Sequence, residues 1–255
     1  MYCNIIIFHK LMTLINSFDK NGKFLFRYRG QLPLLFFVLA LPITYCYEYN
    51  FLISSPRLKS LVLILSCFVF VLGHTFRIII IGYCEQHTSG RNRHEQVAHH
   101  LNTKGWYSMV RHPLYFANFL IWIGLSLYLV NPMLSLLLCL CYWLYYERIM
   151  FMEENFLFNK FGNEFQIWAN KVPAFIPNVF LYEKSPNKFS LKTVCANEYP
   201  SIVSTATSLL VLILFRRFSM EGSVIWLWSD AYFAVSILVF GLSFRWIKHR
   251  TLWFK

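Results

Sequence analysis

The feature that most constrains this chain is a series of apolar segments, several of them long enough to cross a bilayer as helices. Leu61–Tyr83, Leu114–Val130 and Val224–Phe244 each contain at most one Asp, Glu, Lys or Arg. A backbone in lipid must satisfy its polar groups internally, and a helical span needs about 20 apolar residues. The sequence therefore predicts an all-α, polytopic membrane protein built as a helical bundle.

Three further apolar runs bring the prediction to about six transmembrane helices: Leu32–Tyr47, Met133–Tyr146 and Ile202–Phe215. Only Asn131-Pro132 separates Leu114–Val130, the third predicted span along the chain, from Met133–Tyr146, the fourth. These two spans should therefore be antiparallel neighbours. The fourth run is short, and we expect it either to tilt or to continue as an amphipathic helix toward Glu154. Hydrophobic residues make up 57% of the chain and charged residues 14%, which is far more apolar than a typical soluble domain.

The basic residues predict the topology of this bundle. With the N-terminus in the cytoplasm, successive cytoplasmic segments carry 5, 4, 6 and 4 Lys and Arg residues, the opposite segments carry 2, 0 and 2, and Arg77 lies within a span. The positive-inside rule then places both termini in the cytoplasm. Attraction to anionic lipid headgroups accounts for the net charge of +12. Nucleic-acid binding is disfavoured because the charges flank the spans and form no binding motif.

The polar stretches divide the chain into three parts. Residues 1–84 form a basic N-terminal segment with two transmembrane helices, residues 85–180 form a core around the central hairpin, and residues 181–255 form a two-helix extension. The seven cysteines lie mostly in apolar runs without a Cys-x-x-Cys pair. They are therefore expected to be reduced core residues, and no metal site is predicted.

Polar residues bracket the central hairpin on both sides. Arg111-His112-Pro113 precedes its first helix, where a proline loses no hydrogen bond and favours initiation. Tyr107 and Tyr115 are able to flank the same point, and Glu153-Glu154 follows the second helix. These residues fit a binding pocket. They also fit an interfacial helix start with a snorkelling arginine and a solvated acidic face.

The order of these motifs resembles one family. Arg-His-Pro-x-Tyr at 111–115, an apolar hairpin, Glu153-Glu154, Phe161-Gly162 and Val172–Pro177 together resemble the isoprenylcysteine carboxyl methyltransferase and phospholipid methyltransferase superfamily. The resemblance covers roughly residues 90–180. Members are integral membrane enzymes that use S-adenosyl-L-methionine, so the resemblance implies a methyl-transfer site. The extension after residue 180 looks like that of bacterial relatives suggested to methylate acidic lipid groups such as a lipid A phosphate, which implies a bacterial inner membrane. The distribution of basic residues predicts that the site faces the cytoplasm.

The resemblance also implies roles for individual residues. His112 and Arg111 are the candidate catalytic residues, and the positions expected to contact the cofactor are Tyr107, His112, Tyr115, Asn118, Glu153, Glu154, His99 and Leu101. Asn118 equally suits an interhelical hydrogen bond. Arg148 and Arg77 are candidate anchors for the substrate. Arg77 lies inside a span, where an ionisable group marks a functional site or pairs with another charge such as Asp230.

The function predicted from the sequence is methyl transfer from S-adenosyl-L-methionine to a lipid or lipid-modified substrate, with an acidic headgroup favoured. A prenylated cysteine and phosphatidylethanolamine stay open as acceptors. Two other classes also stay open. His94 and His99-His100 resemble one histidine box of membrane di-iron desaturases, although the other histidines form no second cluster, and a non-enzymatic membrane scaffold would have the same composition. No Gly-x-Gly-x-x-Gly motif follows a predicted strand, so the bundle itself must bind the cofactor.

Overall fold

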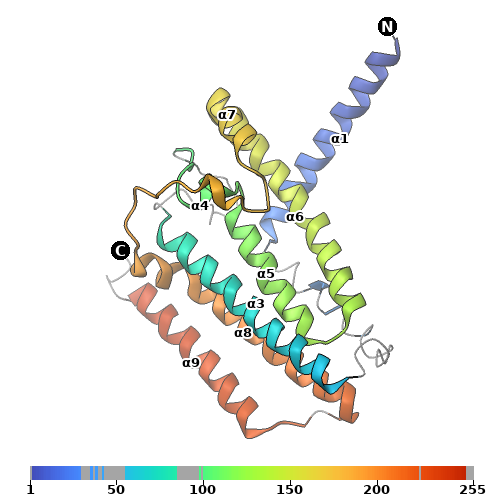
Figure 1. The fold of residues 1–255 in the computed structure, drawn as a ribbon, viewed down its shortest axis with the longest axis vertical. Helices are drawn as coiled ribbons and strands as arrows, with labels where there is room; N and C mark the ends of the chain where they lie inside the picture. Colours follow the sequence, from blue (N-terminus) through green and yellow to red (C-terminus); the bar gives the residue numbers. More distant parts are fainter. Residues whose placement is uncertain are drawn as a thin grey trace.

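The computed structural model of the protein describes residues 2–29, 35–36, 38–39, 42, 55–84, 98, 100–223 and 225–250. This part of the chain is helical and contains no β-strand, which confirms the predicted all-α class (Figure 1). Its elements are α1 (Tyr2–Arg27), α3 (Pro56–Gly82), α4 (Trp106–Met109), α5 (Pro113–Tyr128), α6 (Pro132–Phe161), α7 (Asn163–Lys171), the 3-10 helix η1 (Val179–Leu181), α8 (Leu191–Glu221) and α9 (Trp228–Arg250).

Four of the described helices, α3, α6, α8 and α9, are long and apolar enough to cross a membrane, and α5 is a shorter apolar helix of 16 residues. The protein is therefore an integral membrane protein. Helix α6 runs unbroken to Phe161, so the predicted continuation of the fourth span through Glu154 is confirmed. The first predicted span, Leu32–Tyr47, lies largely outside the described residues.

Helix α8 begins well before the predicted span at Ile202 and contains Pro200. A proline inside a helix leaves the carbonyl four residues earlier without its usual amide partner. Here the carbonyl of Ala196 instead accepts a hydrogen bond of 3.0 Å from Lys248 Nζ on α9. Lys248 on α9 thus satisfies the carbonyl group that Pro200 leaves without an amide partner in α8.

The basic N-terminal segment forms a helix, α1, whose C-terminal half packs across α6 (Figure 1). Phe18, Gly22, Leu25 and Phe26 recur at the spacing of one helical face. At Gly22 an added Cβ would lie only 2.5 Å from the carbonyl oxygen of Arg148. The basic residues of this segment are most visible in the sequence, but its apolar face determines where the segment packs.

Helices α3 and α5 pack closely through glycines. A Cβ at Gly73 would lie 2.8 Å from the backbone nitrogen of Ile121, and one at Gly124 would lie 2.8 Å from the backbone of Phe70. Ser66 Oγ donates a hydrogen bond of 2.7 Å to the Gly124 carbonyl. Membrane helices use small residues and hydroxyl groups in this way to bring their backbones together.

Replacing Gly73 by Ala should therefore destabilise the protein by about 1–3 kcal/mol, because the new methyl group forces α3 and α5 apart. Gly241→Ala is the matched control, since a Cβ there meets only the Val203 side chain at 3.2 Å. Thermal unfolding of the purified protein measures both effects. Equal melting temperatures for the two variants would contradict the close packing of α3 on α5.

Candidate functional site

Two segments on either side of the hairpin meet at one end of the bundle. The amide of Arg111 donates to the carbonyl of Pro173 at 2.9 Å, and the amide of His112 donates to that of Ala174 at 3.2 Å. Pro113 begins α5 directly afterwards, so His112 stands at the N-cap. These backbone bonds hold the Arg-His-Pro motif against the segment that ends at Pro177, and the helical reach of α6 brings its acid pair to the same place.

An acid–histidine cluster forms there from Arg111, His112, Tyr115, Glu153 and Glu154. His112 Nε2 lies 2.9 Å from Glu154 Oε1, and His112 Nδ1 lies 3.5 Å from Glu153 Oε2. The Tyr115 hydroxyl donates a hydrogen bond of 2.8 Å to Glu153 Oε1. Arg111 Nε lies 3.2 Å from Glu154 Oε1 as an ion pair without hydrogen-bond geometry. The structure thus brings five of the predicted site residues together.

The positive and negative charges of the acid–histidine cluster compensate one another in a partly buried site. Only 7% of His112 is exposed, whereas the Glu153 and Glu154 side chains are 22% and 23% exposed. Burial lowers the pKa of His112, but hydrogen bonds and electrostatic attraction to Glu153 and Glu154 outweigh burial and raise the pKa above its ordinary value. A protonated His112 with Arg111 balances the two carboxylates, and neutrality is what a poorly solvated site favours.

The stability of the protein should consequently depend on pH through His112. Its folded-state pKa is higher than the unfolded value of about 6.5. Its stabilising contribution is therefore complete below pH 6.5 and is lost as the pH rises through the raised folded-state pKa. Thermal unfolding between pH 6 and 9 should show a smaller decline in His112→Gln than in the wild type. Identical pH profiles for the two proteins would contradict a protonated His112 between the acids.

Tyr107 on α4 completes the second side of the site. Its backbone carbonyl accepts a hydrogen bond of 3.1 Å from the Trp168 indole, which fixes α4 against α7. Burial raises the pKa of Tyr107 well above its ordinary value, and Cys84 and Glu153 raise it further. Glu153, which accepts the hydrogen bond of Tyr115, thus also acts electrostatically on Tyr107. A pocket flanked by the two tyrosines stays a prediction.

Two predicted residues, Leu101 and Arg148, have other surroundings, and a third is not described. Leu101 packs on the apolar cluster of α7 that also contacts Tyr107, while His99 lies outside the described residues. Arg148 does not join the acid–histidine cluster. Its Nη1 donates to the Leu144 carbonyl at 3.0 Å and its guanidinium lies 5.3 Å from the centre of the Phe18 ring, so it faces α1.

Asn118 and Arg77 belong to a separate buried group. Arg77 Nε and Nη2 each donate to the Glu198 carboxylate at 2.7 Å, and Nη1 donates to Asn118 Oδ1. The Glu198 side chain is 1% exposed. The interhelical role considered for Asn118 is confirmed, and a substrate role for Arg77 stays a prediction. The alternative pairing of Arg77 with Asp230 is wrong, because Asp230 caps the start of α9 and binds Arg217.

Sequence reasoning missed Glu198. It is the one acidic residue between Glu183 and Glu221, and it lies at the beginning of the apolar part of α8. A lone acid beside a lone basic residue in a neighbouring span is a usable signal, because neither charge is stable in lipid without a partner. Two acids, Glu198 and Asp230, met this criterion, and only the packing of α8 on α3 distinguishes them.

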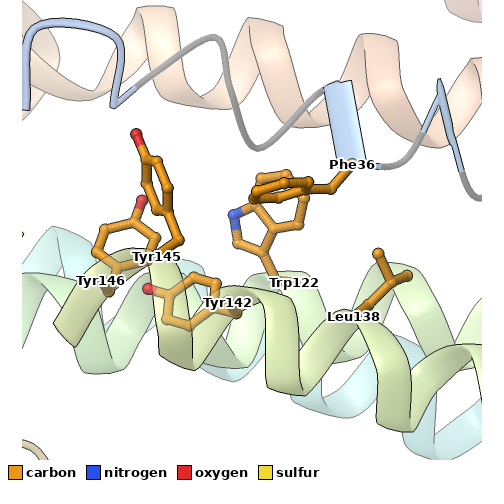
Figure 2. A pocket seen from close by; sticks show the side chains of 6 residues that line it. All are labelled: Phe36, Trp122, Leu138, Tyr142, Tyr145 and Tyr146. Atoms are coloured by element: carbon orange, nitrogen blue, oxygen red, sulfur yellow. The ribbon is translucent and has the colours of Figure 1, made fainter. Parts of the chain in front are cut away.

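Aromatic side chains of α5 and α6 pack next to the site, in the interior of the bundle. A small hollow is lined by Phe36, Trp122, Leu138, Tyr142, Tyr145 and Tyr146, with the three tyrosine hydroxyls toward one end (Figure 2). The Tyr142 hydroxyl donates a hydrogen bond of 2.7 Å to the Tyr115 carbonyl, and the Tyr115 and Tyr146 rings lie 4.8 Å apart. The polar cluster is thus continuous with an apolar, aromatic interior.

Comparison with known proteins identifies the segment that holds this cluster. Residues 59–164 match the family model described as phospholipid methyltransferase. This segment is similar to the phospholipid methyltransferase family and to protein-S-isoprenylcysteine O-methyltransferases. It includes every member of the acid–histidine cluster, Arg77 and Asn118, whereas Glu198 and the segment ending at Pro177 lie outside it.

Individual relatives match over similar ranges. Protein-S-isoprenylcysteine O-methyltransferase B of Arabidopsis thaliana is 33% identical over 113 residues, 43% of this chain and 56% of the relative. The protein-S-isoprenylcysteine O-methyltransferase of Schizosaccharomyces pombe is 38% identical over 80 residues, 31% and 34% of the two chains. A nickel-cobalt-cadmium resistance protein of Alcaligenes xylosoxydans xylosoxydans is 35% identical over 112 residues, 44% and 50%. The chain spans about half the length of the curated relatives it matches, and no solved structure matches it significantly.

Proposed function

We propose that this protein is a membrane methyltransferase that transfers a methyl group from S-adenosyl-L-methionine to an acidic group on a lipid or lipid-modified substrate. The observation that carries this proposal is the acid–histidine cluster, assembled from both sides of the hairpin inside the segment shared with methyltransferases. A scaffold protein would need no such concentration of ionisable groups beside an apolar interior.

The residues present fit the proposed cofactor. When bound, S-adenosyl-L-methionine supplies a methyl group on a positively charged sulfur. Glu153 and Glu154 are partly exposed, so a ligand can reach them, and their carboxylates complement hydroxyl groups and positive charge. His112, Tyr115 and Arg111 hold these carboxylates in place. The cofactor contacts that we propose also include Tyr107, Leu101, Asn118 and His99, of which His99 lies outside the described residues.

The contacts of His112 affect which chemical class of methyl acceptor the site favours. A phosphate or carboxylate oxygen is already deprotonated at neutral pH, whereas an ammonium headgroup must first lose a proton to a base. Both ring nitrogens of His112 already face carboxylates, Nδ1 at 3.5 Å from Glu153 and Nε2 at 2.9 Å from Glu154, so His112 is poorly placed to accept that proton. We therefore favour an acidic acceptor, either a lipid phosphate or the carboxylate of a prenylated cysteine, over phosphatidylethanolamine.

We also propose that the site faces the cytoplasm of a bacterial cell from the inner membrane. The start of α1 and the end of α9 lie toward the same end of the bundle as α4 (Figure 1). Basic residues are concentrated toward that end, in α1, in the segments around α4 and α7, and in the last part of α9, whereas Arg57, Lys59, Arg216 and Arg217 mark the other end. The positive-inside rule supports this orientation, and the metal-resistance relative from Alcaligenes xylosoxydans xylosoxydans is a bacterial protein.

Transfer of labelled methyl from S-adenosyl-L-methionine by the purified protein, reconstituted with bacterial lipid extract, tests the function. We expect label in a lipid, as a methyl ester that base hydrolyses. Base-stable label on an amine would refute the acidic acceptor. If extract alone stays unlabelled, a prenylated cysteine is supplied next, and absence of label with both acceptors would refute the proposed activity.

A further inference from the structure

The segment between α7 and α8 exposes an unusual number of apolar side chains. Ile176, Val179, Phe180 and Tyr182 are 74%, 65%, 94% and 57% exposed, respectively. All four lie within seven consecutive residues and outside the helices that are able to span a membrane. A contiguous exposed apolar surface of this kind indicates contact with a partner or with a membrane.

This segment is held firmly against the loop that carries the site. The amide of Asn178 donates to the Met109 carbonyl at 2.9 Å, the amide of Gly105 donates to the Glu183 carbonyl at 2.8 Å, and the amide of Glu183 donates to Ser108 Oγ at 2.8 Å. These bonds span both ends of η1, which lies beside α4. The exposure of Phe180 is therefore a fixed feature of the fold, and its orientation is set relative to His112.

The charges on either side of the apolar residues are almost all positive. Exposed lysines stand at Lys171, Lys184, Lys188 and Lys192, and the nearby acid Glu183 is engaged by Lys104. An apolar tip flanked by lysines matches the chemistry of a bilayer surface that contains anionic lipid, where apolar groups enter the acyl region and lysines stay at the headgroups.

We propose that residues 176–188 form an interfacial anchor that inserts Phe180 and its apolar neighbours into a membrane surface containing anionic lipid. The anchor lies in the same bilayer that the spanning helices cross and fixes the site loop at headgroup level. An acidic lipid attracted by Lys184 and Lys188 is thereby concentrated beside the acid–histidine cluster. This inference concerns membrane contact and holds whether or not the methyl-transfer assignment is correct.

Photocrosslinking tests the proposal without an activity assay. The full-length protein carries benzoylphenylalanine at position 180, or at position 179 as a second probe, in nanodiscs of phosphatidylcholine with a minority of phosphatidylglycerol. Mass spectrometry then identifies the adducts. Position 238 on α9, where Leu238 is 62% exposed, serves as the lipid-facing control.

We expect lipid adducts at both probe positions. The anionic lipid should be enriched over its share of the bilayer on the order of fivefold, as near-surface basic residues predict. Lys184→Gln combined with Lys188→Gln should remove most of that enrichment, while Arg57→Gln with Lys59→Gln at the opposite end should leave it unchanged. Adducts at position 238 without lipid adducts at 179 or 180, or adducts only to protein there, would overturn the anchor. Equal enrichment in all variants would overturn the role of the two lysines.

Discussion

Replacing Glu153 by Gln should lower the rate of methyl transfer by about 10²- to 10³-fold, the cost typical of removing one preorganised electrostatic contact from an active site. Glu153 accepts the hydrogen bond of Tyr115 and lies 3.5 Å from His112, so its carboxylate position is fixed before a ligand arrives. Glutamine preserves the size of the side chain but removes the charge that, in our proposal, complements the cofactor's sulfonium.

Glu147→Gln is the matched control, since Glu147 lies on the same helix and is exposed to the surroundings. It should retain the wild-type rate. Tyr115→Phe should have an intermediate effect, about tenfold, because it removes one hydrogen bond to a charged group. Initial rates with reconstituted protein, together with melting temperatures showing that each variant is folded, measure these effects. Wild-type activity in folded Glu153→Gln would contradict the role assigned to the acid–histidine cluster.

Loss of either member of the Arg77–Glu198 pair should destabilise the protein by about 3–5 kcal/mol, because the remaining charge is left buried and uncompensated. Arg77 is only 12% exposed and Glu198 only 1% exposed. We expect Arg77→Met and Glu198→Leu each to cause this loss, and the double variant to recover most of it, since an apolar pair requires no charge compensation.

The exposed pair of Lys104 and Glu183 provides a control, with side chains 53% and 49% exposed. Lys104→Gln should change the melting temperature little, because solvent screens exposed ion pairs. Thermal unfolding of all four variants in the same detergent measures the contrast. If the losses in Arg77→Met and Glu198→Leu simply add in the double variant, the pair does not join α3 to α8 as described.

Patterns that depend on order along the chain predicted the helical class and most of the site. The Arg-His-Pro motif and the Glu153-Glu154 pair bracket a hairpin with a minimal turn, so their meeting follows once α5 and α6 are antiparallel. The length of α6 also followed, because the recurrence of apolar and acidic residues through Glu154 has a helical period. Local chemistry and chain connectivity were sufficient for these features.

Features that depend on how distant helices pack could not be predicted. Charge alone made Asp230 and Glu198 equivalent partners for Arg77, and only the contact of α8 with α3 selects Glu198. Arg148 is near Glu153 in sequence, yet it lies on the face of α6 that α1 covers. The side chains that wall the site, Tyr142 and Tyr146, were indistinguishable from other aromatic residues of a lipid-facing helix until the hairpin partner was placed.

The most direct test of the central claim is the affinity of purified protein for S-adenosylhomocysteine, measured by isothermal titration calorimetry. With the acid–histidine cluster as the cofactor site, we expect the wild type and Glu147→Gln to bind S-adenosylhomocysteine. The affinity of Glu153→Gln for this ligand should be at least about tenfold weaker, equivalent to about 1.4 kcal/mol. Absence of binding by folded wild-type protein, or equal affinity in Glu153→Gln, would contradict it.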